Sequence, residues 1–296
     1  MPTGDRKLDE FESLFRSAVK EVFHFQPPEL RRALLITDLE RGASAALEAS
    51  VRAFLSTIDS AEQMEWSDLA REDWADPRPG DPIENLLAQI RAREPDLIVT
   101  YRHLLAANKN NPYTLGSVVD TLTQAVEVPV LLLPPTEIGA PMLAPQSGTH
   151  RVMVVTDHLT GRDELVNLAV EFTQNDGTLF LAHIEDQTPL EHILEVIDKL
   201  RRIDSEQARE DIPAKLLSMP ADYIDSVVGV LKKNGVNETL VPVVRMGHGL
   251  RDYAELVAEH QIDLIILSGK DESQQAMHGM AHALAVELRH KPILLL

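Results

Sequence analysis

The chain repeats itself, and this repeat constrains its fold more than any other feature. Three segments of the first half recur in the same order in the second: RRALLITD (31–38) with HRVMVVTD (150–157), PGDPIENLLAQIRAREPDLIVT (79–100) with MGHGLRDYAELVAEHQIDLIIL (246–267), and VPVLLL (128–133) with KPILLL (291–296). Ordered matches of this kind indicate two related units. The length of 296 residues agrees, because a domain typically has about 100–200 residues.

The offsets between the matched segments show where the two halves differ. The offset is 119 residues from Asp38 to Asp157, 167 residues from Asp96 to Asp263, and 163 residues at the final pair. The second half therefore contains 48 additional residues between its first strand and its later helix, which is about one strand-plus-helix unit. We expect the additional material to include strand 177–184, helix 189–210 and a further helix ending at Gly235.

Hydrophobic periodicity predicts strands that alternate with helices in both halves. The expected strands are 32–37, a weak one near Glu62–Ser67, 96–100, 128–133, 151–156, 177–184, 239–245, 263–267 and 292–296. The expected helices are 42–57, 81–93, 113–126, 161–174, 189–210, 221–233, 249–260 and 273–289. This alternation predicts an α/β fold in which each half is a parallel sheet sandwiched by helices.

We divide the chain into an N-terminal arm (1–30), a shortened domain (31–135), a linker (136–149) and a full-length domain (150–296). The linker is rich in Pro and Gly and poor in charge. An amphipathic helix is predicted in the arm from the apolar residues Leu8, Phe11, Phe15, Ala18, Val19 and Val22. This helix either packs on the body of the protein or serves as a dimerisation or partner-docking arm. We favour packing, because an isolated helix of this length needs tertiary contacts.

Composition excludes several classes of function. The 47 acidic and 28 basic side chains give a net charge of −19, which argues against a nucleic-acid partner because phosphates are bound by Lys and Arg. The absence of cysteine excludes disulfides, thiolate catalysis and cysteine-based metal sites. The sequence shows no signal peptide and no apolar run long enough to span a membrane. We therefore expect a cytoplasmic protein without membrane contact.

A ligand is expected where two strands end. In a doubly wound sheet the binding crevice lies at the carboxyl ends of the strands, where the strand order reverses. This rule nominates Thr37 and Asp38 in the first half, and Thr156 and Asp157 in the second. An aspartate there accepts hydrogen bonds from a ribose or adenine group, and threonine and a helix N-terminus donate to phosphate. The alternative role for either Asp is that of a helix N-cap.

Several of these features together resemble the universal stress protein family. They are the tandem order, the Thr-Asp ending of the first strand, the two helix–Asp–strand phrases, and the closing VPVLLL and KPILLL. The resemblance covers residues 31–135 and 150–296, as a tandem member would. It implies a five-stranded α/β fold, often dimeric through the last strand, with ATP bound in the nucleotide-binding members.

The first half departs from the family's nucleotide motif, G-x2-G-x9-G-[ST] after the fourth strand. Gly116 and Ser117 remain, two residues late, whereas Tyr101 and Leu104 occupy the first two glycine positions. Those glycines let the backbone approach phosphate, so their loss weakens the site. The resemblance still makes this half the better candidate for ATP or AMP, through Thr37, Asp38, Gly116 and Ser117, with Arg102 and Lys109 nearby.

The second half keeps the spacing of the motif but not its residues. Ser268, Asp271 and Ala281-His282 stand at the motif positions, and Glu272 adds a second acid. Acids that face a triphosphate repel it. We therefore expect this half not to bind ATP in the usual way of the family.

The sequence thus favours a non-catalytic stress-response or signalling protein with a degenerate adenine-nucleotide site. The alternative is an ATP-independent scaffold that has lost both sites and acts on an unknown protein partner. We predict no catalytic residue, because nucleophile motifs are absent. We also predict no metal site, because His278 and His282 form only a two-residue signal.

We expect VPVLLL and KPILLL to pair, which makes the halves an intramolecular pseudo-dimer. Whether two chains form a homodimer is left open.

Overall fold

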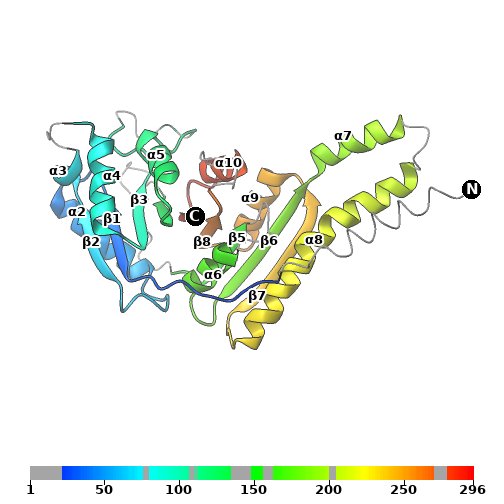
Figure 1. Ribbon diagram of the computed structural model, residues 1–296, viewed down its shortest axis with the longest axis horizontal. Coiled ribbons are helices and arrows are strands. Elements are labelled where there is room, and N and C mark those ends of the chain that lie inside the picture. The colour runs from blue at the N-terminus through cyan, green and yellow to red at the C-terminus, as the bar shows by residue number, and fades with distance from the viewer. Residues whose placement is uncertain are drawn as a thin grey trace, which may run out of the picture.

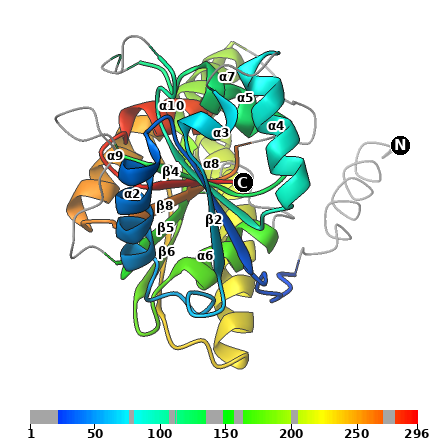
Figure 2. The same cartoon turned by 90° about the vertical axis from the view of Figure 1, so that its left-hand side faces the viewer.

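A computed structural model of the chain describes residues 22–75, 80–106, 111, 113–134, 148–155, 163–199, 205–269 and 279–296. The described strands form a nine-stranded sheet, and helices cover both of its faces (Figures 1 and 2). The strands are β1 (Arg32–Ile36), β2 (Glu65–Leu69), β3 (Leu97–Tyr101), β4 (Val130–Leu133), β5 (Arg151–Val155), β6 (Thr178–Asp186), β7 (Thr239–Gly247), β8 (Leu264–Leu267) and β9 (Ile293–Leu295). The helices are α2 (Arg41–Phe54), α3 (Arg71–Trp74), α4 (Pro82–Arg93), α5 (Ser117–Ala125), α6 (Asp163–Phe172), α7 (Gln187–Asp198), α8 (Ser205–Lys233), α9 (Gly249–Glu259) and α10 (Gly279–Glu287).

The last strands of the two halves join them into one sheet. The strand order is β2-β1-β3-β4-β9-β8-β5-β6-β7, and every neighbouring pair is parallel except β4 and β9. These two strands pair antiparallel, with Leu131 opposite Leu294. The pairing expected between VPVLLL and KPILLL is therefore present. It removes two apolar sheet edges that would otherwise be exposed.

The strand order corrects the sequence analysis about which strand is additional. β6 pairs in parallel with β5, as β2 does with β1, so β6 is the counterpart of β2. The prediction that strand 177–184 belongs to the inserted material is therefore wrong. The strand without a counterpart in the first half is β7, at the outer edge beyond β6. With α8 before it, β7 makes the second half one strand wider.

A second correction concerns α8. The sequence predicts separate helices over 189–210 and 221–233, whereas α7 ends at Asp198 and α8 continues from Ser205 to Lys233 through Pro213 and Pro220. A proline in a helix removes one backbone hydrogen bond, which favours a break. Packing outweighs this loss, because Ile224, Val227 and Leu231 of α8 are buried, and α8 lies against β6 and β7. The short helix α3 was not predicted, since four residues carry no readable period.

Part of the N-terminal arm crosses onto the second half. Residues 1–21, which carry most of the predicted amphipathic helix, and residues 136–147 of the linker lie outside the described residues. Phe23 donates its backbone N–H to Ser226 of α8 at 3.1 Å. On α6, the amide of Asn167 donates to the carbonyl of His24 and accepts from the N–H of Gln26, both at 3.0 Å. We call residues 23–26 the strap, because they tie the start of the first half to α6 and α8.

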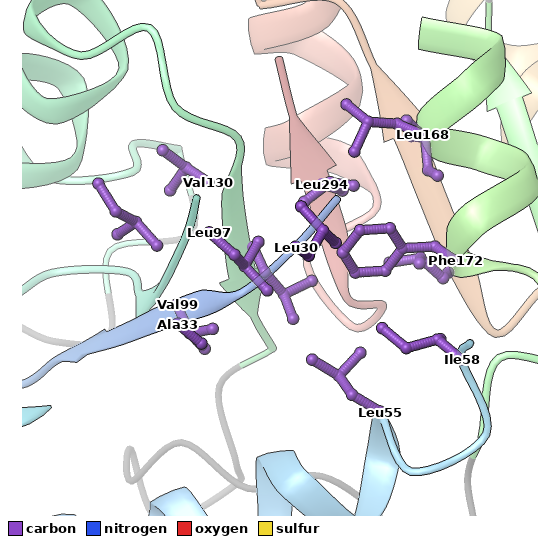
Figure 3. Close-up of a cluster of buried hydrophobic side chains, with 14 of the residues drawn as sticks. Leu30, Ala33, Leu55, Ile58, Leu97, Val99, Val130, Leu168, Phe172 and Leu294 are labelled. Atoms are coloured by element: carbon purple, nitrogen blue, oxygen red, sulfur yellow. The ribbon is translucent and has the colours of Figure 1, made fainter. Parts of the chain in front are cut away.

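The buried core also spans both halves. On one face of the sheet, Leu55, Ile58 and Leu97 of the first half belong to one cluster with Phe172 and Leu294 of the second (Figure 3). A separate cluster combines Leu115, Val119 and Leu132 with side chains of β5, β6, β8 and α9. Neither half therefore buries its core alone.

Replacing Glu171 by Gln should remove a pH-dependent loss of stability. Glu171 of α6 is buried, accepts a hydrogen bond from the backbone N–H of Ser60 at 3.0 Å, and also contacts the Ser60 hydroxyl. Burial, the largest cause, raises the pKa of Glu171 above its ordinary value of 4.5. The folded protein therefore favours the protonated form of Glu171. This preference stabilises the fold fully below pH 4.5, and the stabilisation is lost as the pH rises through the folded-state pKa.

Urea unfolding from pH 4.5 to pH 7 tests this prediction. The stability of E171Q relative to the wild type should increase with pH across this range, because glutamine still accepts from Ser60 but carries no charge. Glu164→Gln, at an exposed position of the same helix, is the matched control and should show no such trend. A parallel pH dependence of wild type and E171Q would contradict the assignment.

Candidate functional site

The residues predicted after β1 meet the end of its neighbour β3. Thr37 and Asp38 follow β1, and Tyr101 is the last residue of β3. Because β1 and β3 are parallel neighbours, their carboxyl ends lie at the same edge of the sheet. The Thr37 hydroxyl lies 2.8 Å from the Tyr101 hydroxyl, which in turn donates to Oδ1 of Asp38. We call these three residues the Thr37–Asp38–Tyr101 cluster.

Both carboxylate oxygens of Asp38 accept hydrogen bonds from the chain itself. Oδ1 accepts from Tyr101, and Oδ2 accepts from the backbone N–H of Leu105 at 3.0 Å. Only 7% of Asp38 is exposed. Its alternative role as a helix N-cap is not observed, because Glu40 holds the N-cap position of α2. The carboxylate that a ribose or adenine would need is therefore engaged by a side chain and a loop of the protein.

Neighbouring groups close the cluster further. The hydroxyl of Thr37 accepts from the backbone N–H of Leu39 at 2.9 Å, and the carbonyl of Thr37 accepts from the indole N–H of Trp74 at 3.0 Å. Trp74 belongs to α3 and is fully buried. Thr37 is fully buried as well. Its side chain thus stabilises the turn after β1 and does not face solvent.

Tyr101 is kept as a neutral hydrogen-bond donor. Burial, the largest cause, and the hydrogen bond to Asp38 raise the pKa of Tyr101 well above its ordinary value. Sequence reasoning noted Tyr101 only as the residue that replaces a motif glycine. It missed that a tyrosine at this strand end reaches the Thr-Asp pair of the next strand. A large hydroxyl-bearing residue in a glycine position was the signal that could have revealed it.

Gly116 lies where two backbone segments of the loop between β3 and α5 approach each other closely. It has φ +94° and ψ 147°, and a Cβ at this position would lie 2.9 Å from the Cα of His103 and 3.0 Å from its backbone nitrogen. The N–H of His103 donates to the carbonyl of Leu115 at 2.8 Å, so the two limbs of the loop touch. His103 and Leu105 themselves adopt positive φ angles. Glycine is thus needed here for close approach of backbone to backbone, while Ser117 is exposed on the first turn of α5.

Arg102 faces the second half of the protein. Its guanidinium is buried and donates through Nη2 to the carbonyl of Ala285 on α10. Its Nε and Nη1 have no hydrogen-bond partner within the described part of the chain. Burial, and then the charge of Arg289, lower the pKa of Arg102 to about 10. The arginine predicted near phosphate therefore contacts the last turn of α10, and Lys109 lies outside the described residues.

The site predicted in the second half is only partly described. Thr156 and Asp157 lie outside the described residues, as do residues 270–278 with Asp271, Glu272 and His278. A cavity of about 870 Å³ lies between α9 and α10. Its lining includes Asp186, His248, Arg251 and Glu255, together with small residues of both helices. The cavity has no counterpart in the sequence prediction.

The described residues contain no group of three or more His, Asp or Glu side chains placed to hold a metal ion. None of the helices in the described ranges combines the length and the apolar character that a membrane span requires.

Comparison with known proteins agrees with the fold. A universal stress protein from Archaeoglobus fulgidus DSM 4304 has 14% sequence identity and a TM-score of 0.52, over 89% of this chain and 95% of that one. A functionally unknown protein from Pseudomonas aeruginosa PAO1 has 12% identity and a TM-score of 0.49, over 90% and 92%. No curated protein matches the sequence. Residues 148–286, in the second half of the chain, match the family model described as the Universal stress protein family.

Proposed function

We propose that the protein is a non-catalytic stress-response scaffold that acts without bound adenine nucleotide. The observation that carries this proposal is the closed Thr37–Asp38–Tyr101 cluster. Asp38 is almost fully buried, and both of its oxygens accept hydrogen bonds from Tyr101 and Leu105. A ligand would have to displace these bonds, and a buried polar group that loses its partner costs about 1–3 kcal/mol.

The neighbouring loop supports the same proposal. In the resembling nucleotide-binding proteins, glycines bring backbone N–H groups to phosphate, whereas Gly116 here is packed against His103. Arg102, the cation at the start of this loop, points to Ala285 of α10. In the second half, Asp271 and Glu272 stand in the corresponding loop of the sequence, where they would repel a triphosphate.

The proposal includes the tandem organisation of the chain. The order β2-β1-β3-β4 repeats as β6-β5-β8-β9, and this supports a shortened unit over 31–135 beside a full-length unit over 150–296. The joint through β4 and β9 supports an intramolecular pseudo-dimer. Such a molecule presents two unequal units as one rigid surface to a protein partner. The acidic, cysteine-free composition supports a cytoplasmic location.

Nucleotide titration tests this function. The purified protein should release no nucleotide on denaturation, as measured by mass spectrometry. Calorimetric titration with ATP and with AMP should show no saturable heat up to millimolar concentration. Saturable binding by the wild type that is lost in Asp38→Asn would overturn the proposal and restore a nucleotide site in the first half. Asp81→Asn, at the N-cap of α4, is the matched control for that comparison.

A further inference from the structure

Helix α8 has a second apolar face besides the one that packs on the sheet. Its residues Ile212, Leu216, Met219, Tyr223 and Ser226 follow one another at alternating intervals of four and three, the spacing of a helix-pairing seam. We call these five residues the α8 seam. Met219 is 55% exposed and Leu216 is 36% exposed. The N-terminal part of the seam is thus an apolar strip that the described residues leave open.

The C-terminal part of the seam is already covered by the strap. The ring of Phe23 meets Tyr223 edge-on, with 6.4 Å between the ring centroids and an angle of 90°. The N–H of Phe23 donates to Ser226 at 3.1 Å, and only 1% of Phe23 is exposed. The preceding residue, Val22, is 55% exposed. Residues 1–21 are therefore joined to the rest of the chain at a point beside Tyr223 of the α8 seam.

The sequence of those residues has the same spacing as the seam. Counting back from Val22, apolar residues stand at intervals of four, three and four at Ala18, Phe15 and Phe11. Counting back from Tyr223, the same intervals lead to Met219, Leu216 and Ile212. Two helices that run in parallel bring such positions together layer by layer. A helix over residues 8–21 is about 21 Å long, and a segment of α8 with the same number of residues has the same length.

We propose that residues 8–21 form a helix that packs parallel to α8 on the α8 seam and covers Leu216 and Met219. In this register Ala18 lies opposite Met219 and Phe15 lies opposite Leu216, so that a small residue faces a long one in one layer. The strap holds the segment beside its binding face. Such a tether gives an effective concentration of the order of millimolar, which favours this occupant over a second molecule.

A disulfide test is sharp in this protein because the chain has no cysteine of its own. In the double variant Ala18→Cys/Met219→Cys, mild oxidation should give an intramolecular disulfide at least tenfold faster than in Ala18→Cys/Ala214→Cys. Ala214 is exposed and lies on the opposite side of α8, five positions from Met219. Reaction rates are measured by peptide mass after digestion, at micromolar protein.

Two outcomes of this experiment would overturn the proposal. Equal rates for the two pairs would mean that the N-terminal segment has no fixed place on α8. A disulfide that forms only between two chains, seen as doubled mass, would mean that a second copy occupies the seam.

Limited proteolysis provides a second measurement that needs no cysteine. Trypsin should cleave the wild type slowly after Arg16 and Lys20, and Phe11→Glu should raise the rate at least tenfold, because a charge in the packed layer displaces the helix. Ser13→Glu, on the other side of the same predicted helix, should leave the rate unchanged. Leu216→Glu on α8 should act like Phe11→Glu. Cleavage at one rate in all four proteins would contradict the proposal.

Discussion

Replacing Phe172 by Ala should lower the free energy of unfolding by about 3–5 kcal/mol, as expected for a buried phenylalanine. Phe172 ends α6, is fully buried, and belongs to the cluster that includes Leu55 and Ile58 of the first half and Leu294 of the second (Figure 3). The substitution leaves a cavity at the place where the halves share their core. Its effect should therefore extend to the first half, although Phe172 belongs to the second.

Two optical signals measure this effect separately. Both tryptophans of the chain, Trp66 and Trp74, lie in the first half, so their fluorescence reports on that half alone. Far-UV circular dichroism reports on helices of both halves. In urea, F172A should shift both transitions to the same lower midpoint. Ile193→Ala, at a half-exposed position of α7, is the control. It should lower the free energy of unfolding by no more than about 0.5 kcal/mol, whichever of the two signals is used.

Separate transitions would contradict the shared core. If F172A lowers the circular dichroism midpoint but leaves the tryptophan midpoint unchanged, the first half is stable without the second. The continuous sheet through β4 and β9 would then be a contact between independent folding units.

Replacing Gly116 by Ala should cost at least about 2 kcal/mol. The backbone of Gly116 has φ +94° and ψ 147°, a region that residues with a Cβ rarely adopt, at a cost of about 1–3 kcal/mol. In addition, the new Cβ would lie 2.9 Å from the Cα of His103, which is closer than van der Waals contact allows. Since the neighbouring atoms are backbone, they cannot move aside at low cost.

Gly235→Ala is the matched control for this substitution. Gly235 also has a positive φ, +76°, but no atom lies within 4 Å of the position its Cβ would take. The control therefore carries the conformational cost alone, about 1 kcal/mol. Thermal or urea unfolding of both variants measures the difference. Equal losses at the two positions would show that the contact with His103 contributes nothing.

The sequence predicted the part of the fold that depends on local periodicity. Apolar runs such as RALLI and LIVTY, followed by helical periods, indicate buried parallel strands with crossover helices, and β1 and β3 are such strands. The repeated closing strands predicted that VPVLLL and KPILLL pair, because two short apolar edges need cover, and the structure pairs them with Leu131 opposite Leu294. The sequence missed α3, because four residues carry no readable period.

The sequence predicted where Thr37 and Asp38 lie in the fold, but not the hydrogen bonds that they make. Thr37 and Asp38 lie at the carboxyl end of β1, where the rule for doubly wound sheets places ligand-binding residues. Their hydrogen bonds to Tyr101 join residues more than 60 positions apart, and no local pattern encodes such a contact. Gly116 was nominated as part of a phosphate motif, yet the structure gives it a close approach to His103.

The sequence by itself therefore determined most of the strands and helices, since helix and strand periods are properties of neighbouring residues. It also determined the repeat and the position of the Thr-Asp pair. Only the tertiary structure decided that Tyr101 engages Asp38, that β7 is the additional strand, and that the strap lies on α6 and α8. The physical reason is that hydrogen bonds and burial are satisfied in three dimensions, by whichever side chain the fold brings within reach.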